Sequence, residues 1–351
     1  MMPVSRWIRR LALAGALLGF CVVVLGAYVR LSAAGLGCPD WPGCYGHLTP
    51  PGAQHSTALA AAFPDKPLDA GKAWREMIHR YAASTLGLIC VGIALLAVAT
   101  RRTPVVGLGY ASALLGVIVF QGALGMLTVT WQLTPLIVTL HLLFGITTLG
   151  LMWWLLLSVP RHPWGGTRPV GHSSVAATPR PGAAAARALV IVALCVLGLQ
   201  IALGGWTSSN YAAVACPDFP KCQNAWWPHT DYRNAFMLWR GLGTNYEGGV
   251  LDNPARVAIH LTHRLGALAA TVALTLAALV TILRSHRPSA RMAAAAVLAA
   301  LGLQLAIGIA MVERGFPLWL ATAHNAGATL LVLATLALVW SLSRSGQRAP
   351  F

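Results

Sequence analysis

Charged residues are scarce in this sequence, and acidic residues are the scarcest of all. Only 10% of the 351 residues are charged and only nine are Asp or Glu, whereas soluble domains carry about 25% charged residues. Hydrophobic residues make up 57% of the chain, and its mean hydropathy is +0.66. This balance excludes an ordinary soluble domain and indicates that most of the chain is surrounded by lipid.

Long apolar runs occupy most of the sequence. A helix needs about 20 apolar residues to cross the hydrocarbon core of a bilayer. The first run lacks a small-residue cleavage site, so we expect a retained helix there and not a removed signal peptide. The sequence therefore predicts an all-α integral membrane protein with eight transmembrane helices, near residues 11–30, 76–99, 105–127, 135–158, 188–207, 257–283, 292–312 and 317–343.

The net charge of +16 raises the question of a nucleic-acid partner, but the distribution of charge points to a bilayer. Arginines cluster at both ends of the chain and on alternate loops, whereas all nine acidic residues fall on the opposite side or at its helix ends. By the positive-inside rule, both termini are cytoplasmic. We expect a multi-pass protein of the bacterial inner (plasma) membrane, with long periplasmic loops that carry cysteines and with no nucleic-acid partner.

The chain contains an internal repeat. A stretch rich in Pro, Gly, Ser, Ala and Arg predicts a cytoplasmic linker over 161–187, between halves 1–160 and 188–351. Each half has four spans, so we expect two tandem four-helix bundles related by a pseudo-twofold axis along the membrane normal. The matching landmarks are CPDWPGC at 38–44 with CPDFPKC at 216–222, Gly26 with Gly205, His79-Arg80 with His263-Arg264, and Gln121, Gly125 and His141 with Gln304, Gly308 and His324.

Four histidines lie near the outer ends of the even-numbered spans: His79, His141, His263 and His324. An imidazole inside a membrane needs a partner. Haem iron accepts one histidine from each of two facing helices, which predicts one haem site per half, with His79 paired to His141 and His263 to His324. Helix–helix hydrogen bonds are the simpler alternative. Zinc is disfavoured because no third ligand recurs in both halves.

One difference between the halves stands out. Glu76 precedes His79 by three residues, whereas His260 precedes His263 by three residues, and this spacing places each pair on one helix face. A carboxylate beside only one histidine pair suggests that the first half carries out chemistry and the second holds a permanent haem. Capping of the helix start by Glu76 is the alternative. Whether His260 or His263 ligates iron is left open, with His263 favoured because it aligns with His79.

Arginines follow two of these histidines directly. Arg80 and Arg264 are candidate contacts for haem propionates, and Arg30 and Arg256 are further candidates. Snorkelling of these side chains to the interface is the alternative.

Four of the seven cysteines lie in the predicted periplasmic loops, in two closely spaced pairs. We expect the disulfides Cys38–Cys44 and Cys216–Cys222, because that side of the membrane is oxidising. A structural role is favoured over a redox relay.

In combination, these features resemble one family, heme A synthase. The resemblance rests on EMIHR at 76–80, the paired cysteines in the first and third external loops, the tandem halves and the four histidines, and the segment at 245–267 is similar to that of proteobacterial members. It implies an oxidoreductase that converts haem O into haem A for terminal oxidases, by oxidising a ring methyl group to formyl through successive hydroxylations.

The resemblance also implies roles for individual residues. His79 and His141 would flank the substrate haem O, and His263 and His324 would ligate a resident haem b. Glu76 would be the catalytic acid or base. The expected partners are haem O synthase and oxidase assembly factors, and the sequence leaves a homo-oligomer open.

Two other functions remain as alternatives. A bis-histidine cytochrome b that transfers electrons would explain the haem sites but not Glu76 in one half only. A secondary transporter with parallel repeats would explain the duplication, but its polar groups are expected near the bilayer midplane.

Overall fold

The computed structural model describes residues 4–50, 62–64, 66–102, 105–159 and 181–343. Within these ranges eight helices are long and apolar enough to cross a membrane, by length and composition. They are α1 (Val4–Leu31), α3 (Ala70–Ala99), α4 (Leu108–Thr130), α5 (Pro135–Ser158), α6 (Pro181–Ser209), α8 (Asn253–Arg284), α9 (Pro288–Glu313) and α10 (Leu318–Ser343). The prediction of an all-helical protein with eight candidate spans is confirmed.

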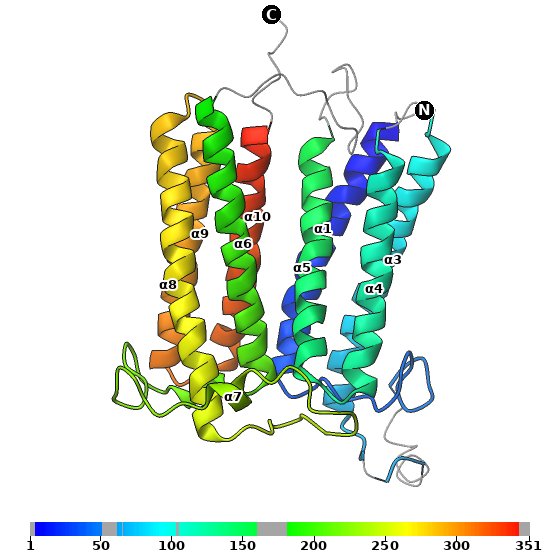
Figure 1. Ribbon diagram of the computed structural model, residues 1–351. Helices are drawn as coiled ribbons and strands as arrows, with labels where there is room; N and C mark the ends of the chain where they lie inside the picture. Colours follow the sequence, from blue (N-terminus) through cyan, green and yellow to red (C-terminus); the bar gives the residue numbers. More distant parts are fainter. Residues whose placement is uncertain (1–3, 51–61, 65, 103–104, 160–180, 344–351) are drawn as a thin grey trace, which may run out of the picture.

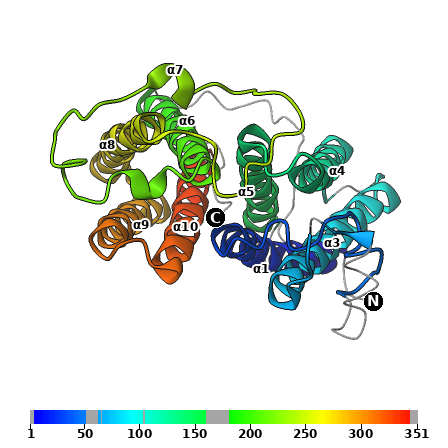
Figure 2. The same cartoon turned by 90° about the horizontal axis from the view of Figure 1, so that it is seen from below.

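The eight helices form two bundles that lie side by side (Figures 1 and 2). The first contains α1, α3, α4 and α5, and the second contains α6, α8, α9 and α10. Each bundle has its own apolar core, with Leu149 and Met152 fully buried in the first and Leu274 and Leu338 in the second. Many other large apolar side chains are exposed on the outer faces of the helices, as expected for surfaces that contact lipid.

Helix packing in one bundle repeats in the other. In the first bundle, α1 and α4 each pack against both α3 and α5. In the second bundle, α6 and α9 each pack against both α8 and α10. Across the boundary, α1 contacts α10 and α5 contacts α6, while α5 and α10 contact each other. A twofold axis between α5 and α10 would produce this set of neighbours, so the packing agrees with a tandem duplication.

The connections separate into two ends of the molecule. Helix α1 begins and α10 ends at one end, whereas the long loops, with the short helices η2 (Ala213–Ala215) and α7 (Tyr232–Ala235), lie at the other (Figure 1). Most of the predicted linker over 161–187 lies outside the described residues. Helix α6 begins at Pro181, so the last residues of that segment are helical.

Helices α3 and α8 begin earlier than the sequence suggested. Helix α3 starts at Ala70, and its N-cap is Asp69, whose carboxylate accepts the backbone N–H of Lys72. This hydrogen bond lowers the pKa of Asp69. Glu76 therefore does not cap α3, and the capping alternative is wrong.

The same shift changes the distance of the histidines from the starts of their helices. Helix α8 starts at Asn253 behind its N-cap Asp252. His79 and His263 then lie about 13–15 Å along their helices from the first residue, because a helix rises about 1.5 Å per residue.

Candidate functional site

His263 on α8 and His324 on α10 face each other in the second bundle. Their ring centroids are 6.5 Å apart, and the ring planes are inclined by 78°. Two imidazoles that bind one metal ion through bonds of about 2.0–2.1 Å place their centroids about 6.4 Å apart. The pair therefore has the separation that a bis-imidazole iron site requires.

His79 on α3 and His141 on α5 form the corresponding pair in the first bundle. In both rings, Nδ1 is buried without a hydrogen-bond partner. Buried polar atoms without partners are rare. Nowhere in the described ranges do three or more His, Cys, Asp or Glu side chains converge to hold a metal ion. A metal held by two protein side chains takes its remaining ligands from elsewhere, and in haem the porphyrin supplies them.

A glycine lies against each of these rings. A Cβ atom would lie 2.8 Å from the ring of His79 at Gly26, 3.1 Å from His141 at Gly125, 3.2 Å from His263 at Gly204 and 3.1 Å from His324 at Gly308. Any larger residue would press on the imidazole, so glycine leaves space for the ring and for a flat ligand beside it. Gly204 is therefore the counterpart of Gly26. Gly205, the match suggested by the sequence, packs against Thr139 and Leu142 of α5.

Glutamine side chains contact three of the four histidines. The pairs are Gln121 with His141, Gln200 with His263, and Gln304 with His324. Among the described residues no glutamine contacts His79. Sequence reasoning used Gln121 and Gln304 only as landmarks of the repeat and missed Gln200, although the pattern of a glutamine four residues before each ring-contacting glycine was visible at all three positions.

Both predicted disulfides are present, Cys38–Cys44 and Cys216–Cys222. Each closes a compact loop at the end of the molecule where the long connections lie. All four cysteines are buried.

In each of these loops, an aspartate carboxylate accepts hydrogen bonds from backbone N–H groups of the same loop. The carboxylate of Asp40 accepts the backbone N–H groups of Tyr45 (2.6 Å) and Gly46 (2.7 Å). Asp218 does the same for Gln223 (2.6 Å) and Asn224 (2.9 Å). Burial alone would raise the pKa of Asp218, but these hydrogen bonds lower it overall. The identical position of Asp in the two motifs was a signal that sequence reasoning did not use.

Arg80 and Arg264 clamp the two loops onto their bundles. Arg80 donates to the carbonyl oxygens of Asp40, Pro42 and Gly43. Arg264 donates in the same way to the carbonyls of Cys216 and Lys221 and to two others in its loop. A haem propionate that reached either guanidinium would have to share these donors.

The further candidate arginines lie elsewhere. Arg30 donates to the carbonyl of Ser208 across the boundary between the bundles and lies 4.2 Å above the ring of Tyr211. Its Nε is buried without a partner, as is Nε of Arg256.

Glu76 links the first loop to the histidine-bearing helix. Its side chain is buried, with 4% exposure. One carboxylate oxygen, Oε1, lies 2.5 Å from the guanidinium of Arg80, and the other, Oε2, accepts the backbone N–H of Cys38 at 2.9 Å. Each oxygen has two lone pairs, so both keep capacity to accept a proton.

The second bundle has no acid at the equivalent place. His260 is buried there, with Nδ1 3.2 Å from the carbonyl oxygen of Ala212 and its ring edge-on to Phe316. Because His260 contacts this carbonyl and His263 faces His324, the geometry favours His263 as the ligand.

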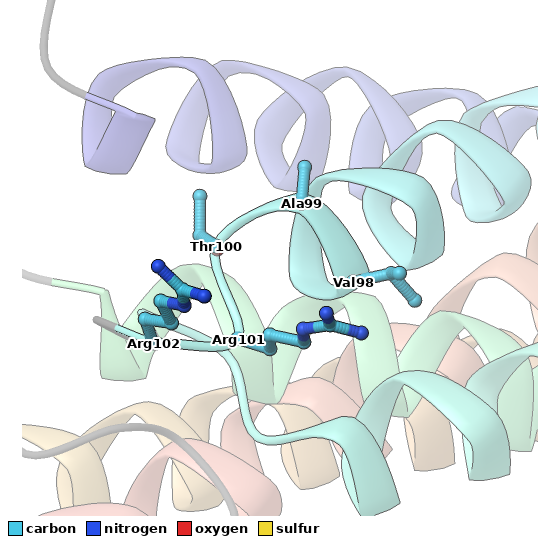
Figure 3. Close-up of a pocket in the computed structure, with 5 residues that line it drawn as sticks. All are labelled: Val98, Ala99, Thr100, Arg101 and Arg102. Carbon is cyan, nitrogen blue, oxygen red and sulfur yellow. The ribbon is translucent and has the colours of Figure 1, made fainter.

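One surface pocket in the described residues, with a volume of about 540 Å³, is lined by Val98, Ala99, Thr100, Arg101 and Arg102. It lies where α3 ends, at the opposite end of the helix from its N-cap (Figure 3). Both arginine side chains are at this end, which is the end predicted to be cytoplasmic. The pocket takes no part in the site.

The chain matches one family model and several known proteins over most of its length. Residues 9–336 match the model of COX15-CtaA, cytochrome oxidase assembly protein. Heme A synthase of Shewanella oneidensis is 40% identical over 346 residues, which cover 97% of this chain and 98% of that protein. The proteins of the same name from Rhizorhabdus wittichii and Paracoccus denitrificans are 27% and 28% identical, over 92% and 88% of this chain and 90% and 81% of their own lengths.

Proposed function

We propose that this chain, which belongs to the COX15-CtaA family of cytochrome oxidase assembly proteins, is a heme A synthase. Its relatives with that name match over nearly the full length. The reaction would be the oxidation of a ring methyl group of haem O to formyl, through successive hydroxylations and loss of water. The enzyme would thus be an oxidoreductase acting on a CH group, with haem O as substrate and haem A as product.

The two bundles would divide the work. Haem O would lie between His79 and His141, and a resident haem b between His263 and His324. Haem iron would supply the redox chemistry when bound. The observation that carries this division is the buried carboxylate of Glu76 beside the first histidine pair, where the second bundle has His260.

Glu76 would act as the catalytic acid or base. Its two oxygens are fixed by Arg80 and by the N–H of Cys38, so the carboxylate is oriented before a substrate arrives. Oε2 has the weaker partner and would accept a proton as the methyl carbon is oxidised. The loop of the first disulfide lies against α3 at this point, since a Cβ atom on Gly37 would strike the backbone of Lys72, and would help to exclude water.

The setting would be the bacterial inner membrane, with both termini cytoplasmic and the disulfide loops periplasmic. Substrate and product would exchange through the bilayer with haem O synthase and with oxidase assembly factors. Arg101 and Arg102 after α3, and Arg284, Arg287 and Arg291 around the connection from α8 to α9, lie at the end opposite the disulfide loops, which supports this orientation.

The experiment that tests the proposal is haem extraction from cells that carry Glu76→Gln. Glutamine keeps an acceptor for the N–H of Cys38 but cannot take up a proton as a carboxylate does. We expect folded protein that retains haem b, accumulation of haem O and no haem A. Wild-type amounts of haem A would refute the role of Glu76 and favour an electron-transfer cytochrome b.

A matched control separates catalysis from the anchoring of the loop. Asp40→Asn weakens the same disulfide loop from within and leaves the contacts of Glu76 in place. Cells with Asp40→Asn should still form haem A. If both variants lost haem A equally, the loop and not the carboxylate would be the essential element.

A further inference from the structure

The four histidines differ in how firmly their neighbours hold them. In the second bundle, Nε2 of Gln200 donates to the carbonyl oxygen of His263 at 3.0 Å and lies 3.0 Å from Nδ1 of the same ring. Nε2 of Gln304 lies 3.2 Å from Nε2 of His324. Both histidines of this bundle therefore have an amide against the imidazole.

The side-chain amides of Gln200 and Gln304 each pack directly against a second glycine. A Cβ atom on Gly266 would overlap Oε1 of Gln200, and one on Gly327 would overlap Oε1 of Gln304. These glycines lie one turn beyond the histidines on the same helices. The glutamine and the glycine thus form a unit, because the amide fits only where the facing residue has no side chain.

The first bundle has this unit at one histidine only. Gln121 donates to the carbonyl oxygen of His141 at 2.9 Å and is seated against Gly145. At the position equivalent to Gln200, four residues before the ring-contacting glycine, α1 has Val22.

His79 therefore lacks both parts of the unit. The position on α3 that corresponds to Gly266 is Ala82, three residues after the histidine. Helix α1 offers His79 the backbone carbonyl of Val22 in place of a side chain, and Nδ1 of His79 is buried without a hydrogen-bond partner.

The amides are suited to hold metal-bound imidazoles. A histidine that ligates a metal through one nitrogen keeps its orientation by donating its other N–H to a fixed acceptor. Oε1 of all three glutamines is buried and lacks a partner. At Gln200, the amide lies against Nδ1 of His263 and donates to the carbonyl of the same residue, which holds the ring and leaves its other nitrogen for iron.

We propose that Gln200 and Gln304 hold both histidines of the second bundle for a haem that stays, and that the pair Val22 and Ala82, which places no amide against the ring, lets His79 release its haem. The first bundle is then the site at which haem enters and leaves, with His141 as the fixed ligand and His79 as the exchanging one. This inference rests on the proposed function, which requires one resident haem and one haem that turns over.

The test grafts the missing unit onto the first bundle. The full chain is purified in detergent micelles with both sites loaded with haem b, and loss of haem to excess apomyoglobin is followed by absorbance. Wild type should lose haem in a fast and a slow phase. Val22→Gln with Ala82→Gly should slow the fast phase by about tenfold or more, the size of effect seen when outer partners of metal ligands change.

Val22→Met with Ala82→Gly is the matched control, because methionine has nearly the shape of glutamine but no amide. Its fast phase should stay at the wild-type rate. The reciprocal variant, Gln200→Val with Gly266→Ala, should accelerate the slow phase. It also tests the inference if the grafted variant does not fold.

A single phase in wild type, or equal rates in the glutamine and methionine variants, would overturn the inference. So would an unchanged slow phase in the reciprocal variant. Haem A formation in the same cells is a separate readout. If wild type made no haem A but the two phases responded as stated, the proposed function would fail and the difference in histidine locking would stand.

Discussion

Arg80→Ala and Arg264→Ala, which each remove an arginine that holds a disulfide loop, should lower the free energy of unfolding by different amounts. Arg80 has an acidic partner, Glu76, at 2.5 Å, and the exposed fractions of the two side chains are 12% and 5%. Arg264 donates only to carbonyl oxygens. Arg80→Ala leaves a buried carboxylate without its cation, whereas Arg264→Ala leaves only carbonyls, some of which water can reach.

The magnitudes follow from this difference. Breaking a buried ion pair by removing one partner costs about 3–5 kcal/mol, so Arg80→Ala should lower the free energy of unfolding by that amount. Hydrogen bonds from a charged donor contribute about 1.5–3 kcal/mol in favourable cases. Because Arg264 is partly exposed, we expect a loss near the lower figure for Arg264→Ala.

The assay is unfolding in mixed micelles with increasing SDS, followed by tryptophan fluorescence, for both variants and for Arg80→Ala combined with Glu76→Gln. The double variant should recover part of the loss, because the uncompensated charge is gone. Equal losses for the two arginines, or no recovery in the double variant, would refute the reasoning. Loss of haem with full stability in Arg80→Ala would instead indicate that Arg80 contacts a propionate.

Three further outcomes are expected. His263→Ala or His324→Ala should lower the haem b content of the purified protein, and unchanged stoichiometry in both would remove the second haem site. Rapid alkylation and mass spectrometry should find no free thiol at Cys38 or Cys44. Asp69→Ala should lower stability by about 1 kcal/mol as a lost helix cap. The folded-state pKa of Asp69 lies below its ordinary value of 3.8. The contribution of Asp69 to the free energy of unfolding is therefore complete above that pH and is lost as the pH falls through the lowered pKa. A melting series against pH that is identical in wild type and variant would contradict this.

Helix positions show where pattern reading succeeds and where it stops. The apolar runs located all eight spans, because bilayer thickness sets a length that hydropathy reports directly. The starts of α3 and α8 were misplaced, because both helices continue beyond their apolar stretch into polar residues with an N-cap at Asp69 or Asp252. Hydropathy marks the lipid boundary, whereas the cap marks the end of the helix.

The sequence by itself determined the class of protein, the duplication and the four histidines, since composition, spacing and residue type carry that information locally. Only the tertiary structure decided that Arg80 and Arg264 clamp the disulfide loops, because their partners are backbone carbonyls, which every residue has. It also decided that Glu76 joins the loop to α3, through a contact between residues 38 positions apart. The contacts between each glutamine and its glycine depend on which helices pack together and in what register. The sequence pattern alone does not specify that register.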